Sequence, residues 1–231
     1  MGGYDISKLA QALEYFKVDN PSQKLDLLIK YFALISENRL WGSLTSRSVA
    51  INPIIPVVQS LSMLQAITRV GPGGIGEIGS GGGILGISLA IARDDWIFTL
   101  IESNARKSAF LAEVSGKLRL KNVIVKRSRA ENLAGKADFD YVVSRAAGRL
   151  DSLLPVGLAL AGDEGQFLTL KGKAQAKEIE KLQREGEVAA GSERSIRIDF
   201  IEPKLPEWFP ENSRVLIVVA RKIREDIGRG S

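Results

Sequence analysis

Hydrophobic residues in the first part of the chain recur every three or four positions, which is the spacing of amphipathic helices. The pattern predicts helices over 7–16 and 21–35, and a third, broken by prolines, over 51–67. A polar loop containing Trp41 separates the second helix from the third. We therefore expect residues 1–70 to form an N-terminal helical part.

Beyond this part, short apolar runs alternate with longer helical runs, which predicts a mostly parallel sheet covered on both faces by helices. The predicted strands cover 75–79, 97–102, 122–126, 139–144, 166–170, 195–201 and 214–220, and the predicted helices cover 84–92, 104–118, 150–160 and 173–184. No long helix separates the last two strands, so we expect them to form an antiparallel hairpin at the sheet edge. The fold class is α/β, with this domain over 71–222 and a tail over 223–231.

The segment EIGSGGGILG, from Glu77 to Gly86, joins the first predicted strand to its helix and holds five glycines between positions 79 and 86. Glycine has no Cβ, so such a loop can turn tightly and approach a ligand closely. The next predicted strand ends in an acid, Glu102, which could accept hydrogen bonds from ribose hydroxyls. A strand, a glycine loop, a helix and a second strand ending in an acid predict a site for an adenosine-containing cofactor.

Two cofactors fit this loop. The spacing Gly81-x-Gly83-x-x-Gly86 matches a dinucleotide loop, so the spacing alone does not exclude NAD. Glu77 stands two residues before the first glycine, where it would repel a pyrophosphate but attract the cationic methionine moiety of S-adenosylmethionine. Local chemistry therefore favours S-adenosylmethionine, with Glu77, Gly79, Gly81, Gly83 and Glu102 as cofactor-binding candidates.

The composition limits the chemistry. Cysteine and histidine are both absent from the 231 residues, which excludes disulfides, thiolate or imidazole metal sites, cysteine nucleophiles and histidine bases. No apolar run is long enough for a membrane helix, and the N-terminus does not resemble a secretion signal. We expect a cytoplasmic, monomeric protein that needs no metal and no membrane.

Positive charge is concentrated in one stretch. The net charge is +5, and residues 117–129, KLRLKNVIVKRSR, hold six basic residues and no acid. Such a stretch can bind a nucleic-acid backbone, or it can be a solvated junction between a helix and a strand. The sequence leaves both readings open.

Residues that directly follow the predicted strands are the ones to consider for function, because ligands of open α/β sheets bind outside the carboxyl ends of the strands. These residues are Gly79–Gly83, Glu102–Ser103, Ser128–Glu131, Ser144–Arg145 and Lys171–Gly172. They combine acids, glycines and basic residues, which indicates a cofactor cleft with a polyanion-binding surface at its mouth.

With these strand ends, the chain resembles the RsmG/GidB family, bacterial S-adenosylmethionine-dependent methyltransferases that modify guanine N7 in 16S ribosomal RNA. The segments that carry the resemblance are EIGSGGGILGISLAIA (77–92), FTLIESNARKSAFLAEV (98–114), LRLKNVIVKRSRAEN (118–132), FDYVVSRAAGRLDSLL (139–154) and GQFLTLKGK (165–173). The resemblance implies a Rossmann-like class I methyltransferase sheet with an N-terminal helical part.

The resemblance also implies roles for particular residues. It implies that Gly79 and Ile84 line the cofactor loop, that Ala130 and Glu131 border the adenine, and that Arg145 reaches the cofactor side of the cleft. Two more basic positions, Arg129 and Lys171, would face substrate or cofactor. From the residues alone, Arg145 could instead form a salt bridge to Asp138 or Asp140, and Lys171 could be an ordinary strand-end lysine. Trp41 could stack on a base, but packing in the core of the helical part is favoured.

The chain departs from the family pattern at several positions. Gly82, Leu85 and Ser88 replace three prolines of the family loop, so we expect a less rigid loop. In the helical part, only Trp41, Leu44-Thr45 and Ser60-Leu61 of the family motifs remain, and Pro56 and Gln59 stand where the family carries His and Asp.

The implied reaction suits this composition. Guanine N7 carries a lone pair and no proton, so attack on the sulfonium methyl needs no general base, only positioning and a polar pocket. Arg145, Lys171 and Arg129 are the positioning candidates, and ribosomal RNA or the small ribosomal subunit is the implied partner. The alternatives are a methyltransferase of another substrate and a non-catalytic RNA- or ribosome-binding protein that keeps the fold.

Overall fold

The computed structural model describes residues 5–37, 52–69, 71–145, 148–172, 175, 178–181, 187–189 and 194–224. The N-terminal part consists of helices α1 (Ile6–Tyr15), α2 (Pro21–Glu37) and α5 (Ile54–Ser62), and α5 runs into the short helix η1 (Met63–Gln65). These elements confirm the three predicted helices. Trp41, Leu44 and Thr45 lie outside the described residues.

The central sheet has eight strands in the order β3-β2-β1-β4-β5-β8-β7-β6. The strands are β1 (Gly74–Ile78), β2 (Ile97–Ile101), β3 (Val123–Lys126), β4 (Phe139–Arg145), β5 (Ala161–Gly172), β6 (Glu187–Ala189), β7 (Arg194–Ile201) and β8 (Val215–Arg224). The pairs among β1 to β5 are parallel, and the pairs β5–β8, β8–β7 and β7–β6 are antiparallel. This arrangement confirms the mostly parallel sheet with an antiparallel edge.

The structure adds to the predicted elements in two places. β6 lies outside the predicted hairpin of β7 and β8 and was not predicted, because three residues are too few to show an alternating pattern. β5 begins five residues before the predicted strand 166–170, through a stretch whose glycines and acids gave no strand pattern. Most of the predicted helix 173–184 lies outside the described residues, and 178–181 are helical.

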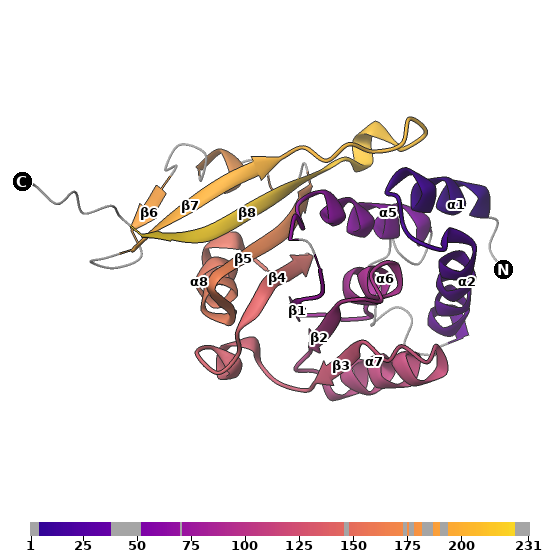
Figure 1. The fold of residues 1–231 in the computed structure, drawn as a ribbon, viewed down its shortest axis with the longest axis horizontal. Coiled ribbons are helices and arrows are strands. Elements are labelled where there is room, and N and C mark those ends of the chain that lie inside the picture. The colour runs from indigo at the N-terminus through magenta and orange to yellow at the C-terminus, as the bar shows by residue number, and fades with distance from the viewer. Residues whose placement is uncertain are drawn as a thin grey trace, which may run out of the picture.

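Helices cover the two faces of the sheet unequally (Figure 1). On one face, α6 (Ile84–Ala92) and α7 (Ala105–Lys117) share a hydrophobic cluster with α1, α2, α5 and the strands. On the other face, α8 (Leu150–Leu160) packs against β4, β5 and β8. The N-terminal helices therefore share one core with the sheet, and they pack mainly against α6.

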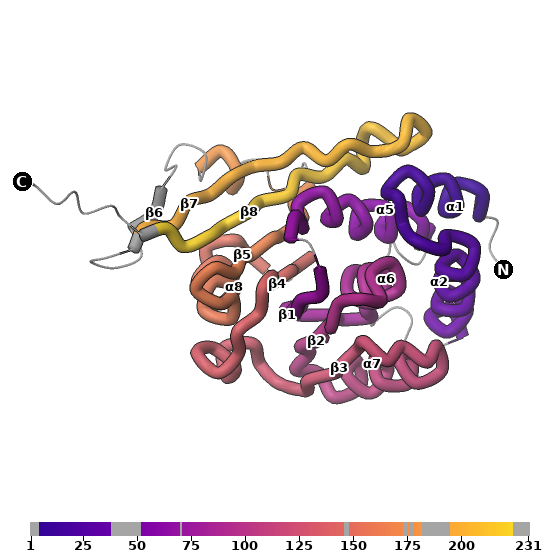
Figure 2. The backbone as a smooth tube through the Cα atoms, viewed as in Figure 1, coloured from indigo at the N-terminus to yellow at the C-terminus, as the bar shows by residue number. Residues whose placement is uncertain are grey.

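Polar contacts fix the N-terminal helices to distant segments. The buried Lys24 of α2 forms an ion pair with Asp94, with Nζ 2.6 Å from Oδ2, just after α6. The connection between β7 and β8 runs beside α1 and α5 (Figure 2). There Gln65 exchanges two hydrogen bonds with the backbone of Lys204, and the Lys8 ammonium lies 5.5 Å from the ring centre of Trp208.

Candidate cofactor site

The loop between β1 and α6 requires its glycines for backbone reasons. Gly79, Gly81 and Gly83 have φ angles of 68°, 56° and 88°, in the left-handed region that side chains disfavour. The amides of Gly79 and Ser80 both donate to the carbonyl of Ile101, at 2.9 and 3.2 Å, so the loop is fastened to the end of β2. This loop lies where the strand order reverses between β1 and β4, at the switch point of the sheet.

The structure brings Glu102 to this loop, as the sequence predicts. The Gly81 amide donates to Glu102 Oε2 at 2.9 Å, and the Asn104 amide donates to Oε1 at 2.7 Å. A carboxylate has about four lone-pair positions, so each oxygen keeps a further site for a hydrogen bond. Glu102 is thus held in place by backbone amides and can still accept hydrogen bonds from a ribose.

Glu77 is the most unusual acid of the site. Its side chain is 3% exposed, and its Oε2 atom has no hydrogen-bond partner among the described residues. Burial raises its pKa to about 8, although Ser80, the Gly86 amide and the Arg145 charge act in the opposite direction. Glu77 is therefore mostly protonated at neutral pH in the free protein.

Gly86 allows α6 to lie directly against Glu77. A Cβ at position 86 would stand 2.3 Å from Glu77 Oε2 and 2.3 Å from Leu100 Cδ2. A side chain at position 86 would force Glu77 or Leu100 to shift, so the third glycine of the dinucleotide-like spacing is explained by close packing of the helix on the strands. The third glycine of a dinucleotide loop has this same packing role, so Gly86 does not distinguish between the two cofactors.

Arg145 lies at the carboxyl end of β4 and joins the sheet to α5. Its Nη2 donates to Gln59 Oε1 at 3.1 Å, and Gln59 Nε2 donates to the Ser213 carbonyl at 2.7 Å. The alternative pairing with Asp138 or Asp140 is not what the structure shows, because Asp140 accepts from Arg69 and from the Gly74 amide instead. The positive charge of Arg145 is close enough to Glu77 to stabilise its ionised form.

Sequence reasoning missed Tyr31 of α2, whose hydroxyl donates to the Gly82 carbonyl at 2.6 Å in the buried interior. Tyr31 lies three residues after Leu28 and four before Ile35, and this helical spacing could have placed it on the buried face. It could not have revealed a partner 51 residues away.

The residues that the resemblance assigns to the adenine side lie next to Glu102. The Ser128 amide donates to the Glu102 carbonyl at 3.2 Å, and the short helix η2 (Ala130–Leu133) follows. Ala130 is buried, whereas Arg129 and Glu131 are exposed. Ile84 is buried in the first turn of α6.

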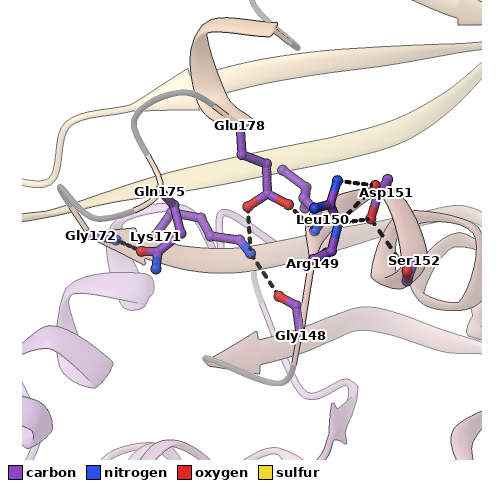
Figure 3. A network of polar contacts seen from close by, with 9 residues as sticks. All are labelled: Gly148, Arg149, Leu150, Asp151, Ser152, Lys171, Gly172, Gln175 and Glu178. Carbon is purple, nitrogen blue, oxygen red and sulfur yellow. Dashed lines mark hydrogen bonds and ion pairs between the residues drawn. The ribbon is translucent and has the colours of Figure 1, made fainter.

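Lys171 belongs to a separate polar network at the end of β5 (Figure 3). Its ammonium donates to the Gly148 carbonyl at 3.1 Å and lies 3.2 Å from Glu178 Oε2, and only 3% of its side chain is exposed. Glu178 also accepts from the Leu150 amide at the start of α8. In this arrangement Lys171 ties β5, the β4–α8 connection and residue 178 together, so its charge is already neutralised.

The basic stretch lies on the surface around the edge strand β3. Its members Arg119, Lys121, Lys126, Arg127 and Arg129 are exposed, and no described carboxylate forms an ion pair with them. Lys117, in contrast, pairs with Glu113 at 2.7 Å. Because Glu102 donates its amide to the Lys126 carbonyl, the unpaired charges begin beside the cofactor loop.

Known proteins resemble the chain over this region. Residues 24–201 match the GidB family, described as rRNA small subunit methyltransferase G. Proteins named ribosomal RNA small subunit methyltransferase G from Clavibacter sepedonicus and Sorangium cellulosum are 35% and 41% identical over 146 and 128 residues. These matches span 63% and 53% of this chain, and 62% and 53% of the two relatives. A protein of the same name from Marinomonas is 31% identical, over 71% of this chain and 77% of its own.

Solved structures agree on the fold. A SAM-dependent O-methyltransferase from Thermotoga maritima has a TM-score of 0.51 at 16% identity, covering 71% of this chain and 64% of its own. Precorrin-6y C5,15-methyltransferase from Geobacter metallireducens has a TM-score of 0.50 at 16% identity, covering 80% and 94%. The fold is thus the Rossmann-like class I methyltransferase fold. Among the described residues, no helix has the length and apolar character to span a bilayer, and no group of acids could hold a metal ion.

Proposed function

Because the chain belongs to the GidB family, rRNA small subunit methyltransferase G, we propose that it transfers a methyl group from S-adenosylmethionine to N7 of a guanine in 16S ribosomal RNA. The matched region covers only about three fifths of the Clavibacter relative, so cofactor, reaction and substrate are our assignment for this chain. A ribosomal substrate would place the protein in the cytoplasm, and we propose that it acts as a monomer.

The observation that carries the proposal is the glycine loop with its two acids. Three left-handed glycines turn the loop backbone beside Glu102, which keeps lone pairs for ribose hydroxyls. Glu77 Oε2 is buried and has no hydrogen-bond partner in the part of the chain that the structure describes, at the position that suits the cationic methionine moiety. A carboxyl left unpaired costs stability, and a cationic ligand group would remove that cost by favouring the ionised form.

The residues present fit a reaction that depends on positioning. S-adenosylmethionine, when bound, supplies an electrophilic methyl group on a sulfonium. Guanine N7 offers its lone pair directly, so no residue has to remove a proton, in keeping with the absence of histidine and cysteine. Arg145, held by Gln59 next to Glu77, would orient the cofactor side of the cleft. Lys171 would act indirectly, by holding the connection before α8.

The unpaired cations beside Glu102 would hold the RNA. Lys126, Arg127 and Arg129 are exposed and lie at the carboxyl end of β3. The cofactor loop lies at the same end of the sheet, after β1. Phosphate contacts by such residues supply most of the affinity of nucleic-acid binding and position the target base.

The test begins with calorimetry of S-adenosylmethionine, S-adenosylhomocysteine and, as a control, NAD. We expect micromolar binding of the two sulfur ligands and none of NAD. The protein is then incubated with S-adenosylmethionine and either intact small subunits or naked 16S RNA from cells lacking the modification, and 7-methylguanine is measured by mass spectrometry. Cofactor binding with 7-methylguanine in either substrate supports the proposal.

Other outcomes identify the alternatives. Methyl transfer to a different RNA position or to a protein would indicate another substrate, which the altered N-terminal motifs make the strongest competitor. Binding of small subunits without binding of either sulfur ligand would indicate a non-catalytic RNA-associated protein. Binding of NAD would revive the dinucleotide reading.

A further inference from the structure

Tyr31 connects the N-terminal helical part to the cofactor loop. It lies on α2 with no exposed surface, and its hydroxyl donates to the Gly82 carbonyl at 2.6 Å. That distance is typical of a strong O–H···O hydrogen bond. Burial raises the pKa of Tyr31 well above its ordinary value, and the Glu77 carboxyl raises it further, so the phenol stays neutral and keeps its proton to donate.

The contact falls at the point where the loop needs an external restraint. Gly82 stands between Gly81 and Gly83, which both have positive φ angles, and three consecutive glycines have the largest backbone freedom to lose on ordering. Tyr31 also borders Gly83, because a Cβ at position 83 would stand 3.3 Å from its hydroxyl oxygen. The phenol therefore fixes both the direction of the Gly82 carbonyl and the space next to Gly83.

We propose that Tyr31 is a positioning residue for the cofactor, which holds the glycine loop in its binding shape from α2. In this view α2 is part of the cofactor site although it lies in the N-terminal helical part. Without the hydroxyl, the buried Gly82 carbonyl would lose its partner and the loop would sample other conformations, so ligand binding would have to order it. The proposal rests on the proposed function, since it takes the loop to bind S-adenosylmethionine.

The experiment compares two tyrosine variants. Tyr31→Phe removes one hydroxyl and keeps the packed ring. The matched control is Tyr141→Phe, because Tyr141 is also buried and its hydroxyl accepts from the Thr68 and Arg69 amides at 3.1 Å, at the opposite end of the sheet. We measure the Kd of S-adenosylhomocysteine by calorimetry, the Tm, and hydrogen exchange of residues 79–84 without ligand.

We expect Tyr31→Phe to raise the Kd about tenfold and to speed exchange in the loop, because an unpartnered buried carbonyl costs about as much as that change in affinity. Tyr141→Phe should lower the Tm about as much as Tyr31→Phe does. It should change the Kd less than about twofold. Equal Kd values for wild type and Tyr31→Phe, or equal weakening in both variants, would overturn the proposal. If wild type binds neither sulfur ligand, the proposed function fails first, and this proposal fails with it.

Discussion

Acids at the two ends of the sheet have different hydrogen-bond partners. At the amino end, Asp140 accepts from the Arg69 guanidinium and from the Gly74 amide, and the Tyr141 hydroxyl accepts from two amides. At the carboxyl end, Glu77 is buried with an oxygen that no described residue partners, and its pKa is raised to about 8. Asp140 is thus paired within the chain, whereas Glu77 keeps an oxygen without a partner among the described residues.

This difference between Asp140 and Glu77 does not follow the size of the hollows in the structure. The amino end carries a hollow of about 490 Å³, lined by Asp138, Asp140 and Glu164 among others. Of these acids, Asp140 is already paired with Arg69 and the Gly74 amide. An unpartnered buried polar group costs about 1–3 kcal/mol, and a cationic ligand group beside Glu77 would compensate for that cost. Lys171 also lies at the carboxyl end, but its charge is already paired with Glu178, so position at this end does not by itself indicate a free group.

The largest expected effect comes from a substitution in the glycine loop at the carboxyl end of the sheet. Gly81→Val should weaken binding of S-adenosylhomocysteine more than about 100-fold, because a β-branched residue is strained at a φ of 56° and the Gly81 amide would leave Glu102. Calorimetry measures the loss. The matched control is Gly135→Val, at a φ of 71° with open space around it and far along the chain from the loop. Unchanged affinity in Gly81→Val would refute the assignment of the loop.

The second prediction concerns the protonated acid. The folded pKa of Glu77 is raised to about 8 from an ordinary 4.5, so the folded state binds more protons than the unfolded state between these values. Stability should therefore be unaffected by Glu77 below about pH 4.5 and should fall as the pH rises towards 8, by at most about 1.4 kcal/mol per pH unit.

Glu77→Gln mimics the protonated side chain and should remove that dependence. Urea unfolding of both proteins at pH 5, 6, 7 and 8 gives the difference in the free energy of unfolding, in which the other titrating groups cancel. The variant should gain on wild type as the pH rises. A difference that stays constant with pH would show that Glu77 is already ionised, and the contrast between the two ends of the sheet would disappear.

The sequence predicts most of this arrangement because its signals are local. The alternation of strands with helices, the glycine loop and the acid at Glu102 follow from spacing within single segments, and the structure brings Glu77, Glu102 and the loop together as expected. The Tyr31–Gly82 bond and the Arg145–Gln59 bond join residues 51 and 86 positions apart. Only the packing of the N-terminal helices on α6 creates them, so no local pattern contains them.

Lys171 illustrates a second limit of the sequence. The family resemblance implies that Lys171, which follows the predicted strand 166–170, faces substrate or cofactor. In the structure Lys171 lies within β5 and its ammonium pairs with Glu178. A strand-end position predicts where the backbone of a residue lies in the sheet. It does not indicate whether a nearby acid already neutralises its charge.

The third prediction tests the surface beside the carboxyl end. Replacing Lys126, Arg127 and Arg129 together by Gln should weaken binding to 16S RNA and make the negative slope of log K against log salt shallower by about 2, if all three contact phosphates. Fluorescence titrations between low and moderate salt measure the slope. The control replaces Arg197 and Arg221, which both lie near Asp199 in ion pairs on β7 and β8. An unaltered slope in the triple variant would make the basic stretch an ordinary solvated surface.

The smallest expected effect concerns the rigidity of the cofactor loop. Gly82 is not among the glycines with positive φ, and its amide donates no hydrogen bond to any described residue, so Gly82→Pro should be accommodated. By restricting the unfolded chain it should raise the free energy of unfolding by about 0.4–1 kcal/mol, measured by urea unfolding. It should also reduce the affinity loss caused by Tyr31→Phe, because both changes act on the freedom of one loop and their effects should not add. Additive effects in the double variant would mean that the Tyr31 phenol does not restrict the loop that Gly82→Pro restricts. The loop would then keep its conformation without help from α2.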